Sequence, residues 1–259
     1  MHFIQRILVL SIVMLLAVAH PAHAEKITIA AASDLKFALD EAIKHYSKNN
    51  PQDEIHVIYG SSGKIFTQIQ QGAPYDIYFS ADTSYPNKLV TDAYAKAPVI
   101  PYAIGRIVLW APNGQYSAAK MSLASLLNPA VKRIAIANPK HAPYGKRAEE
   151  ALKASGLWSQ LESKLVYGEN VSQTAQFVQT GNAEVGIIAL SLALSSGLVK
   201  SGSYSLIPEH LHAPLEQGFV MTKHAEQNPL AGRFANFMVS PEARHIMVRY
   251  GFILPHEQQ

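Results

Sequence analysis

The chain has 259 residues, 48% of them hydrophobic, and it contains no cysteine. This length suits one large domain or two lobes, and the lack of cysteine excludes disulfides and attachment to lipid through a cysteine. The formal net charge of +3 is too small to indicate a nucleic-acid partner.

Residues 1–24 (MHFIQRILVLSIVMLLAVAHPAHA) have the pattern of a secretory signal peptide. One arginine precedes an apolar run over residues 7–18, and residues 22–24 (AHA) match a small-x-small cleavage site. The run is shorter than the roughly 20 residues that a membrane-spanning helix needs. We therefore expect export and cleavage after Ala24.

Residues 26–82 alternate between hydrophobic patterns typical of strands and patterns typical of helices. Residues 26–32 (KITIAAA) predict a buried strand, and apolar side chains at helical spacing follow it over 33–50. Further patterns predict a strand over 54–60, a helix over 61–72 and a strand over 75–82. A strand–helix–strand–helix–strand order predicts parallel strands joined by helical crossovers.

A second series of the same kind follows. Its predicted elements are a strand over 106–112, a strand over 132–139, a helix from Gly145, a strand over 164–168, a helix over 172–180 and a strand over 185–190. A last strand over 218–224 and two helices close the chain.

Two series in one chain predict an α/β protein with two lobes, each a mainly parallel sheet flanked by helices. We expect one lobe over residues 25–103 and 219–259, and the other over 104–218. The candidate crossings, APVIPYAIG and HLHAPLEQG, carry proline and glycine and lack helical periodicity.

Four of the predicted strands lead to a helix start that could hold a ligand. Sheets of this kind bind ligands beyond the carboxyl ends of their strands. These positions carry Ser33, Ser62, Tyr144 and the stretch that ends at Val171. Free N–H groups and the positive end of the helix dipole at each start favour an anion.

The donors at these helix starts are neutral. Hydroxyls of Ser33, Ser62 and Tyr144 could join the backbone N–H groups, whereas no lysine or arginine stands at a cap itself. A cage of neutral donors suits a fully deprotonated oxyanion, because a protonated one would need an acceptor. Any single serine could instead be an ordinary helix cap, so the prediction depends on four matching positions.

Several motifs together resemble the periplasmic molybdate-binding proteins of ABC transporters, and the resemblance covers residues 25 to about 254. It is carried by ITIAAASDL, YGSSGKIFTQIQQGAPYDIYFSAD, NPKHAPYG, YGENVSQT and SPEARHIMVRYGF. It implies the two-lobed periplasmic binding protein fold with the ligand cleft between the lobes. It also implies a tetrahedral dianion, molybdate or tungstate, held by hydrogen bonds alone, with no cofactor and no free metal cation.

Matched position by position, the resemblance places the ligand contacts on Ser33, Ser62, Tyr144 and the backbone of Val171. Some members donate a tyrosine hydroxyl from the strand where this chain has Ala189, and Tyr144 could supply that hydroxyl instead. Asp34 looks like an addition: its carboxylate would repel an anion, so we expect the side chain to point away while its N–H donates. The register leaves Ser61 as an alternative to Ser62.

The expected function is therefore that of a periplasmic, monomeric receptor that performs no chemistry. It would deliver its oxyanion to an inner-membrane ABC permease that works with a cytoplasmic ATPase. Another tetrahedral oxyanion such as sulfate is an alternative ligand.

Two other classes of protein remain open from the residues. Ser61 or Ser62 with Asp82 and a histidine such as His141 could form a hydrolase triad, although YGSSG falls one residue short of the G-x-S-x-G elbow. His210 and His212 beside Glu209 could indicate a metal receptor.

Overall fold

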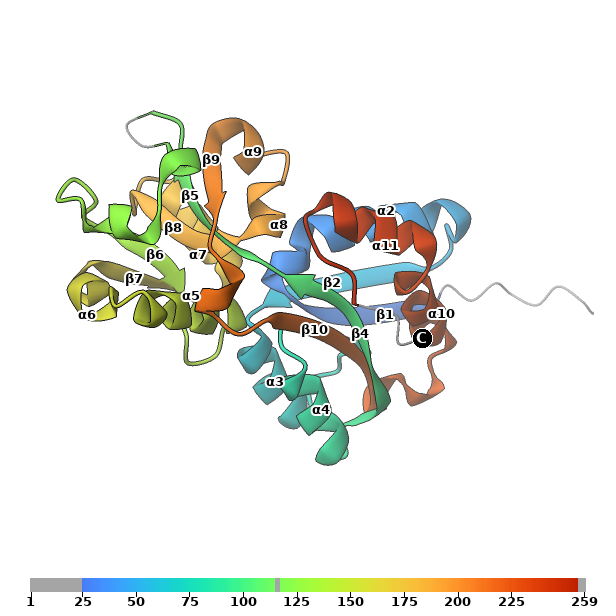
Figure 1. Cartoon of the computed structure of the whole chain (residues 1–259). Coiled ribbons are helices and arrows are strands. Elements are labelled where there is room, and N and C mark those ends of the chain that lie inside the picture. The colour runs from blue at the N-terminus through green and yellow to red at the C-terminus, as the bar shows by residue number, and fades with distance from the viewer. Residues whose placement is uncertain (1–24, 115–116, 256–259) are drawn as a thin grey trace, which may run out of the picture.

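The computed structural model describes residues 25–114 and 117–255, so the predicted signal peptide lies outside the described residues. Figure 1 shows two bodies side by side, each built on a sheet with helices around it. Each of the two sheets has five strands. The chain is thus α/β, as the alternating sequence pattern predicts. Across the described ranges, no helix has both the length and the hydropathy that crossing a bilayer would require.

The first sheet has the strand order β2-β1-β3-β10-β4. Its strands are β1 (Lys26–Ala32), β2 (Glu54–Gly60), β3 (Ile77–Ser80), β4 (Ala95–Gly105) and β10 (Leu215–Thr222). Strands β1, β2 and β3 are parallel, and β10 runs antiparallel to both β3 and β4. Ala32 pairs with Gly60, so β1 and β2 end level with each other and release Ser33 and Ser61 at the same edge.

The second sheet repeats this arrangement in the order β7-β6-β8-β5-β9. Its strands are β5 (Ile107–Pro112), β6 (Ile134–Ala137), β7 (Leu165–Gly168), β8 (Val185–Ala189) and β9 (Gly202–Leu206). Again three neighbouring strands are parallel and one strand, β5, runs against its two neighbours. Ala137 pairs with Gly168, so the loops after β6 and β7 also start from one edge.

Helices cover the faces of both sheets. Around the first sheet lie α2 (Lys36–Asn49), α3 (Ser62–Gln70), α4 (Ser84–Thr91), α10 (Pro229–Met238) and α11 (Pro241–Arg249). The other body carries α5 (Pro143–Ala154), α6 (Trp158–Leu161), α7 (Val171–Gln179), α8 (Leu190–Ala193) and α9 (Leu198–Ser201). Short 3₁₀ helices occupy Ser33–Leu35, Ala118–Lys120, Leu123–Leu127, Glu162–Lys164, Glu209–Leu211 and Lys223–Gln227.

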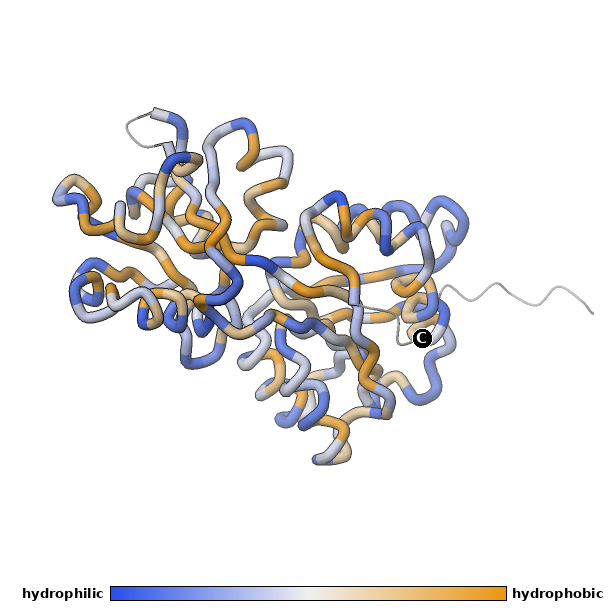
Figure 2. Tube along the Cα trace, in the orientation of Figure 1, coloured by the Kyte–Doolittle hydropathy of each residue, from blue (hydrophilic) through white to orange (hydrophobic). Residues whose placement is uncertain are grey.

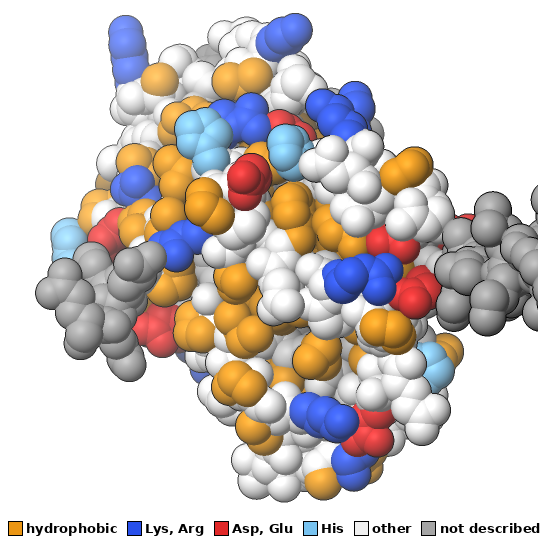
Figure 3. Space-filling model, turned by 90° about the vertical axis from the view of Figure 1, so that its right-hand side faces the viewer, with side chains coloured by type: hydrophobic (Ala, Val, Ile, Leu, Met, Phe, Trp, Pro, Cys, Tyr) orange, Lys and Arg blue, Asp and Glu red, His pale blue; other side chains and the backbone are white. Residues whose placement is uncertain are grey.

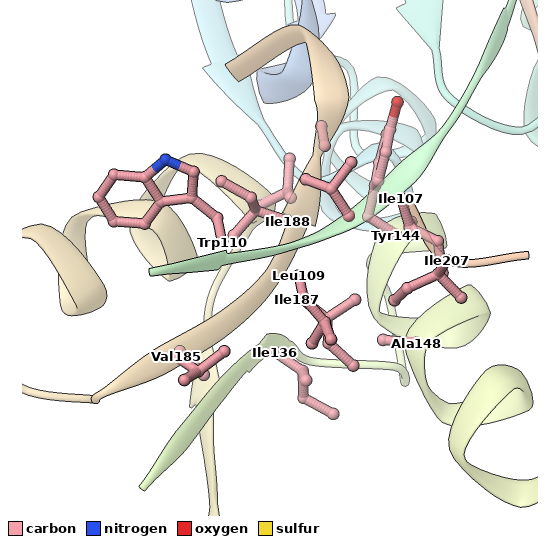
Figure 4. Close-up of a cluster of buried hydrophobic side chains, with 14 of the residues drawn as sticks. Ile107, Leu109, Trp110, Ile136, Tyr144, Ala148, Val185, Ile187, Ile188 and Ile207 are labelled. Carbon is pink, nitrogen blue, oxygen red and sulfur yellow. The ribbon is translucent and has the colours of Figure 1, made fainter. Parts of the chain in front are cut away.

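Each sheet buries its own hydrophobic core. Hydrophobic residues follow the strands in Figure 2, whereas the outer turns are hydrophilic. In the first body, β1 packs against α2, α10 and α11 through residues such as Ile29, Leu39 and Phe234, all fully buried. Figure 4 shows the main cluster of the second body, in which Leu109, Ile136 and Ile187 meet between strands and α5. Removing this apolar surface from water stabilises each body separately.

The chain crosses between the bodies twice. It leaves the first sheet after Gly105 and returns to it at Leu215, the residue that pairs with Gly105. One segment that the sequence suggested as a crossing instead forms most of β4. Its prolines are tolerated because a strand at the edge of a sheet can contain proline. We propose that the lobes divide at these points, at residues 105–106 and 207–214, close to the limits expected from the sequence.

Three other elements, α4, α5 and β9, also differ from the sequence predictions. Helix α5 begins at Pro143 rather than Gly145, because proline is well accommodated at the first position of a helix, where its missing N–H has no partner to lose. The predictions omitted α4 and β9, whose apolar patterns are short. Tyr144 is consequently the second residue of its helix.

Candidate functional site: a pocket between the lobes

A pocket lies where the strand ends of both lobes face each other. The first lobe contributes residues that follow β1, β2 and β3, and the second contributes the starts of α5 and α7. Its lining consists of Ala32, Ser33, Asp34, Gly60, Ser61, Ser62, Ala81, Ala142, Pro143, Tyr144, Asn170 and Val171. This is the edge at which sheets of this type bind ligands.

All five residues that the sequence predicts as ligand contacts line this pocket. They are Ser33, Asp34, Ser62, Tyr144 and Val171. Ser61, the alternative to Ser62, lines it as well, whereas Ala189 does not appear in the lining. The geometry therefore brings the predicted residues together from positions up to 138 apart in sequence.

Ser62 has a hydroxyl proton that no described partner accepts. Its side chain is fully buried, and its Oγ accepts a hydrogen bond from the N–H of Ala81 at 3.0 Å. Because this bond uses the oxygen as an acceptor, the proton stays available for a ligand. Ser62 is the first residue of α3 and does not cap it, so the ordinary role of a serine at a helix start does not account for its position.

The other two serines are already engaged. Ser33 Oγ donates to Asn170 Oδ1 at 3.1 Å and accepts from the N–H of Ser172 at 3.3 Å. Ser61 Oγ lies 2.9 Å from Nδ1 of His141. Each bond joins the two lobes, so Ser33 and Ser61 help to hold them together. Of the two candidates after β2, Ser62 is the better donor to a ligand.

Helix starts add backbone donors to the pocket. Ser62, Tyr144 and Val171 lie in the first turns of α3, α5 and α7, where an N–H group has no partner within its own helix. No hydrogen bond among the described residues engages these three N–H groups. Asn170 caps α7 by accepting from the N–H of Gln173 at 3.0 Å, which fixes the direction of its first turn.

A buried polar cluster adjoins the pocket, and we call its members Asp34, Tyr144, Gln217 and Tyr102 the Asp34 cluster. Asp34 Oδ2 accepts from Tyr144 Oη at 3.0 Å and from Gln217 Nε2 at 2.8 Å. Tyr102 Oη donates to Gln217 Oε1 at 2.6 Å. Tyr144 comes from α5 and the other three from the first lobe, and Figure 4 shows its hydroxyl pointing out of the hydrophobic cluster.

This cluster changes what the sequence indicates for two residues. Tyr144 gives its proton to Asp34, so its hydroxyl is not the free donor that the sequence suggested. Asp34 turns Oδ2 toward Tyr144 and Gln217, but the residue still belongs to the pocket lining. Burial raises the pKa of the Asp34 carboxyl to about 6, although hydrogen bonds from Gln217 and Tyr144 oppose this rise.

Basic side chains lie around the pocket without lining it. Lys64 pairs with Glu169 across the lobes at 2.6 Å, and Arg147 of α5 lies 3.6 Å from Asp82 of the first lobe. Asp34 is the only ionisable carboxyl in the lining, which contains no lysine, arginine or histidine. Figure 3 likewise shows basic and acidic side chains interspersed on one face of the molecule. An anion here would be held by neutral donors.

The side chains suggested for a hydrolase are arranged as contacts between lobes. Asp82 pairs with Arg147 rather than with a histidine. His141 does approach Ser61, and its Nε2 lies 3.8 Å from Glu169, but Glu169 is held by Lys64. Burial lowers the pKa of His141. Ser61 and Glu169 thus contact His141 from opposite sides of the cleft.

A metal receptor receives no structural support either. Within residues 25–114 and 117–255, no group of three or more His, Asp or Glu side chains could hold a metal ion. Glu209, beside the predicted His210 and His212 pair, instead lies 3.4 Å from Arg106.

Several residues of the site escaped the sequence predictions. Gln217 and Tyr102 sit in segments interpreted as crossings, and nothing local in the sequence marks them as partners of Asp34. Asn170 could have been found, because an asparagine directly before a helix is a strong cap signal. Contacts between residues more than 100 positions apart require the fold itself.

Two lobes joined by two crossings, with a small pocket of neutral donors between them, define a solute-binding protein. The family model for "Bacterial extracellular solute-binding protein" matches residues 27–253. The chain is 32% identical to the molybdate-binding protein ModA of Rhodobacter capsulatus over 94% of each chain. It is 33% identical to ModA of Azotobacter vinelandii over 89% of this chain and 91% of the relative. The chain therefore belongs to the bacterial extracellular solute-binding protein family, in the group of the ModA relatives.

Solved structures agree with this assignment. The periplasmic molybdate-binding protein of Azotobacter vinelandii superposes with a TM-score of 0.81 at 29% identity, over 89% of this chain and 100% of that chain. The sulfate-binding protein SubI of Mycobacterium tuberculosis shares the fold with a TM-score of 0.73 at 13% identity, over 90% of this chain and 88% of that one. The chain is a binding protein and not an enzyme, as the sequence predicts.

Proposed function

We propose that this chain binds molybdate, and also tungstate, in the pocket between its lobes. The observation that carries the proposal is the set of unpaired neutral donors: the Ser62 hydroxyl and the N–H groups at the starts of α3, α5 and α7. Three helix dipoles direct their positive ends toward the same small space. The ModA relatives are named for molybdate binding, and this supports molybdate as the oxyanion that these donors hold.

The proposed contacts are the Ser62 hydroxyl and the N–H groups of Asp34, Tyr144 and Val171. Ser33 is a further proposed contact, and its hydroxyl would exchange its hydrogen bond to Asn170 for one to the anion. Tungstate has the same shape and charge as molybdate, so the same donors can hold it. The lobes close on the anion by bending at the two crossings. The closed, monomeric receptor then docks on an inner-membrane ABC permease that works with a cytoplasmic ATPase, after export and removal of residues 1–24.

We expect molybdate and tungstate to raise the melting temperature of the protein, and sulfate and phosphate to leave it unchanged. A ligand that binds only the folded state stabilises it by about 2.7 kcal/mol when its concentration is 100 times Kd. A thermal-shift panel of the four anions measures this. A shift with sulfate alone would overturn the proposed specificity, and no shift with any of them would contradict the receptor function.

Replacing Ser62 with alanine is expected to weaken molybdate binding by about 1–3 kcal/mol, because the anion loses a buried hydrogen bond to a charged acceptor. The same change leaves the N–H of Ala81 without its partner, so we also expect lower stability. Titration calorimetry on the folded protein separates the two effects.

A matched control for this change is Ser80→Ala. Ser80 is equally buried and donates to the carbonyl of Asp82, but it does not line the pocket. Both variants should lose stability, and only Ser62→Ala should lose affinity. Equal affinities in the two variants would remove Ser62 from the site.

A further inference from the structure

Asp34 is an unusual residue to find beside a pocket for a dianion. Only 1% of the residue is exposed, and it belongs to the pocket lining. Its Oδ2 accepts two hydrogen bonds, whereas its Oδ1 is buried and has no hydrogen-bond partner among the described residues. A buried carboxylate oxygen without a partner is costly when ionised.

The neighbours of Asp34 offer no compensating positive charge. Tyr144 from α5 and Gln217 from β10 bind Oδ2, and Tyr102 from β4 lies behind Gln217. Burial raises the pKa values of both tyrosines well above the usual range, so these phenols stay neutral. From α8, Ser191 Oγ donates to the backbone carbonyl of Asp34 at 2.7 Å and leaves the carboxyl untouched.

Helices α2 and α7 also contact the short turn that carries Asp34. Helix α7 carries no ionisable side chain, and Lys36 at the start of α2 is half-exposed and paired with Asp40 at 3.2 Å. At the rim, the cations Lys64 and Arg147 are likewise paired with Glu169 and with Asp82 and Glu150. Lys36, Lys64 and Arg147 therefore each already have an acidic partner.

We propose that binding of the oxyanion takes up one proton, and that Asp34 holds this proton on Oδ1 in the complex. This inference rests on the proposed function. The dianion and an ionised Asp34 would place three negative charges together with only neutral donors around them. One proton taken from the solvent, through the buffer, reduces this total to two, and no bond in the oxyanion breaks.

The choice of oxygen follows from the hydrogen bonds. Oδ2 already accepts from both Tyr144 and Gln217, so a proton there would displace a donor. Oδ1 has no such bond to lose. Protonation on Oδ1 thus keeps both hydrogen bonds to Oδ2 and turns the unpartnered oxygen into a donor that the oxyanion can accept from.

The direction in which pH changes the affinity follows from the coupling between proton binding and anion binding. The surrounding residues alone already raise the pKa of Asp34 to about 6, and an adjacent dianion raises it further. The complex then binds more protons than the free protein at pH values above about 6, so affinity falls as pH rises. We expect Kd to increase about tenfold per pH unit in this range, until the pH passes the pKa in the complex.

Calorimetry in buffers of different ionisation enthalpy tests the proposal by counting the protons taken up with molybdate at pH 7.5. We expect a value close to one for the wild type and close to zero for Asp34→Asn. The Kd of Asp34→Asn should not change with pH, and above neutral pH it should lie below the wild-type value. Binding without proton uptake in the wild type would overturn the inference while leaving the proposed function intact.

Two controls assign the proton to Asp34. Asp92→Asn removes a carboxylate of the first lobe that pairs with Lys88 outside the pocket, and it should leave the uptake unchanged. His141→Gln removes the nearby histidine, whose own protonation could otherwise account for an uptake. Loss of the uptake in His141→Gln, with Asp34→Asn unaffected, would contradict the assignment.

Infrared difference spectroscopy on the wild type provides a test that needs no variant to fold. Adding molybdate should produce the carbonyl band of a protonated carboxyl group, and its absence would overturn the inference. A protein that binds neither molybdate nor tungstate at any pH would overturn both the proposed function and this inference.

Discussion

Replacing Gly63 with alanine is expected to weaken molybdate binding by about 5- to 150-fold, which corresponds to overpacking by about 1–3 kcal/mol. Gly63 lies in the first turn of α3, and its N–H donates to the carbonyl of His141 in the other lobe at 2.9 Å. An added Cβ would lie 2.8 Å from that carbonyl oxygen and 2.9 Å from Tyr85 Oη. Tyr85 can move aside, but the His141 backbone can give way only if the lobes separate.

In the open form that we propose for the protein without ligand, the added methyl group would not meet His141. The stability of that form should not fall, because alanine is a better helix former than glycine. Gly232→Ala is the matched control: it places the same methyl group on helix α10, where it would meet nothing within 4 Å. Calorimetric titration and melting temperatures measure both variants. Unchanged affinity in Gly63→Ala would show that the contact between Gly63 and His141 is not needed for binding.

Replacing Val171 with proline is expected to reduce molybdate affinity by about 10- to 150-fold, the effect of losing one hydrogen bond of about 1.5–3 kcal/mol to a charged group. Val171 is the first residue of α7, where proline fits the helix and its missing N–H breaks no bond of the helix. Asn170 before it is extended, with φ −147° and ψ 174°, as a residue before proline should be. The substitution therefore removes one proposed ligand donor while it preserves the helix.

Val171→Ala serves as the control for this variant, since it shortens the buried side chain but keeps the N–H. We expect Val171→Ala to lose some stability and to retain most of its affinity. Circular dichroism should show that the proline variant keeps its helix content. Equal affinity of the proline and alanine variants would exclude the Val171 amide from the site.

The sequence predicted the strands of the parallel cores well, because each is a short apolar or alternating stretch that is followed by a helix pattern. β1, β2 and β6 lie within or at the predicted limits. Strand β4 was harder, since its two prolines and its terminal glycine suggested a crossing. It forms a strand because its partner β10 arrives more than a hundred residues later, and no local pattern contains that pairing.

In the site, too, some features are encoded locally and others depend on residues far away in the sequence. Positions at helix starts are encoded locally, and Ser33, Ser62, Tyr144 and Val171 all line the pocket. The hydrogen-bond partner of each hydroxyl is not encoded in the neighbouring sequence. The sequence could not show that Tyr144 gives its proton to Asp34, or that Ser62 keeps its own, because both depend on partners from other elements.

The two crossings leave the first sheet from adjacent strands, at the paired residues Gly105 and Leu215. Because these two crossing points are neighbours, the proposed closure would turn the second lobe about one place, at the end of the ladder between β4 and β10. A single hinge angle would then describe the proposed closure on the ion. A permease that contacts both lobes could respond to this angle, and so distinguish the loaded protein from the empty one without contacting the ion.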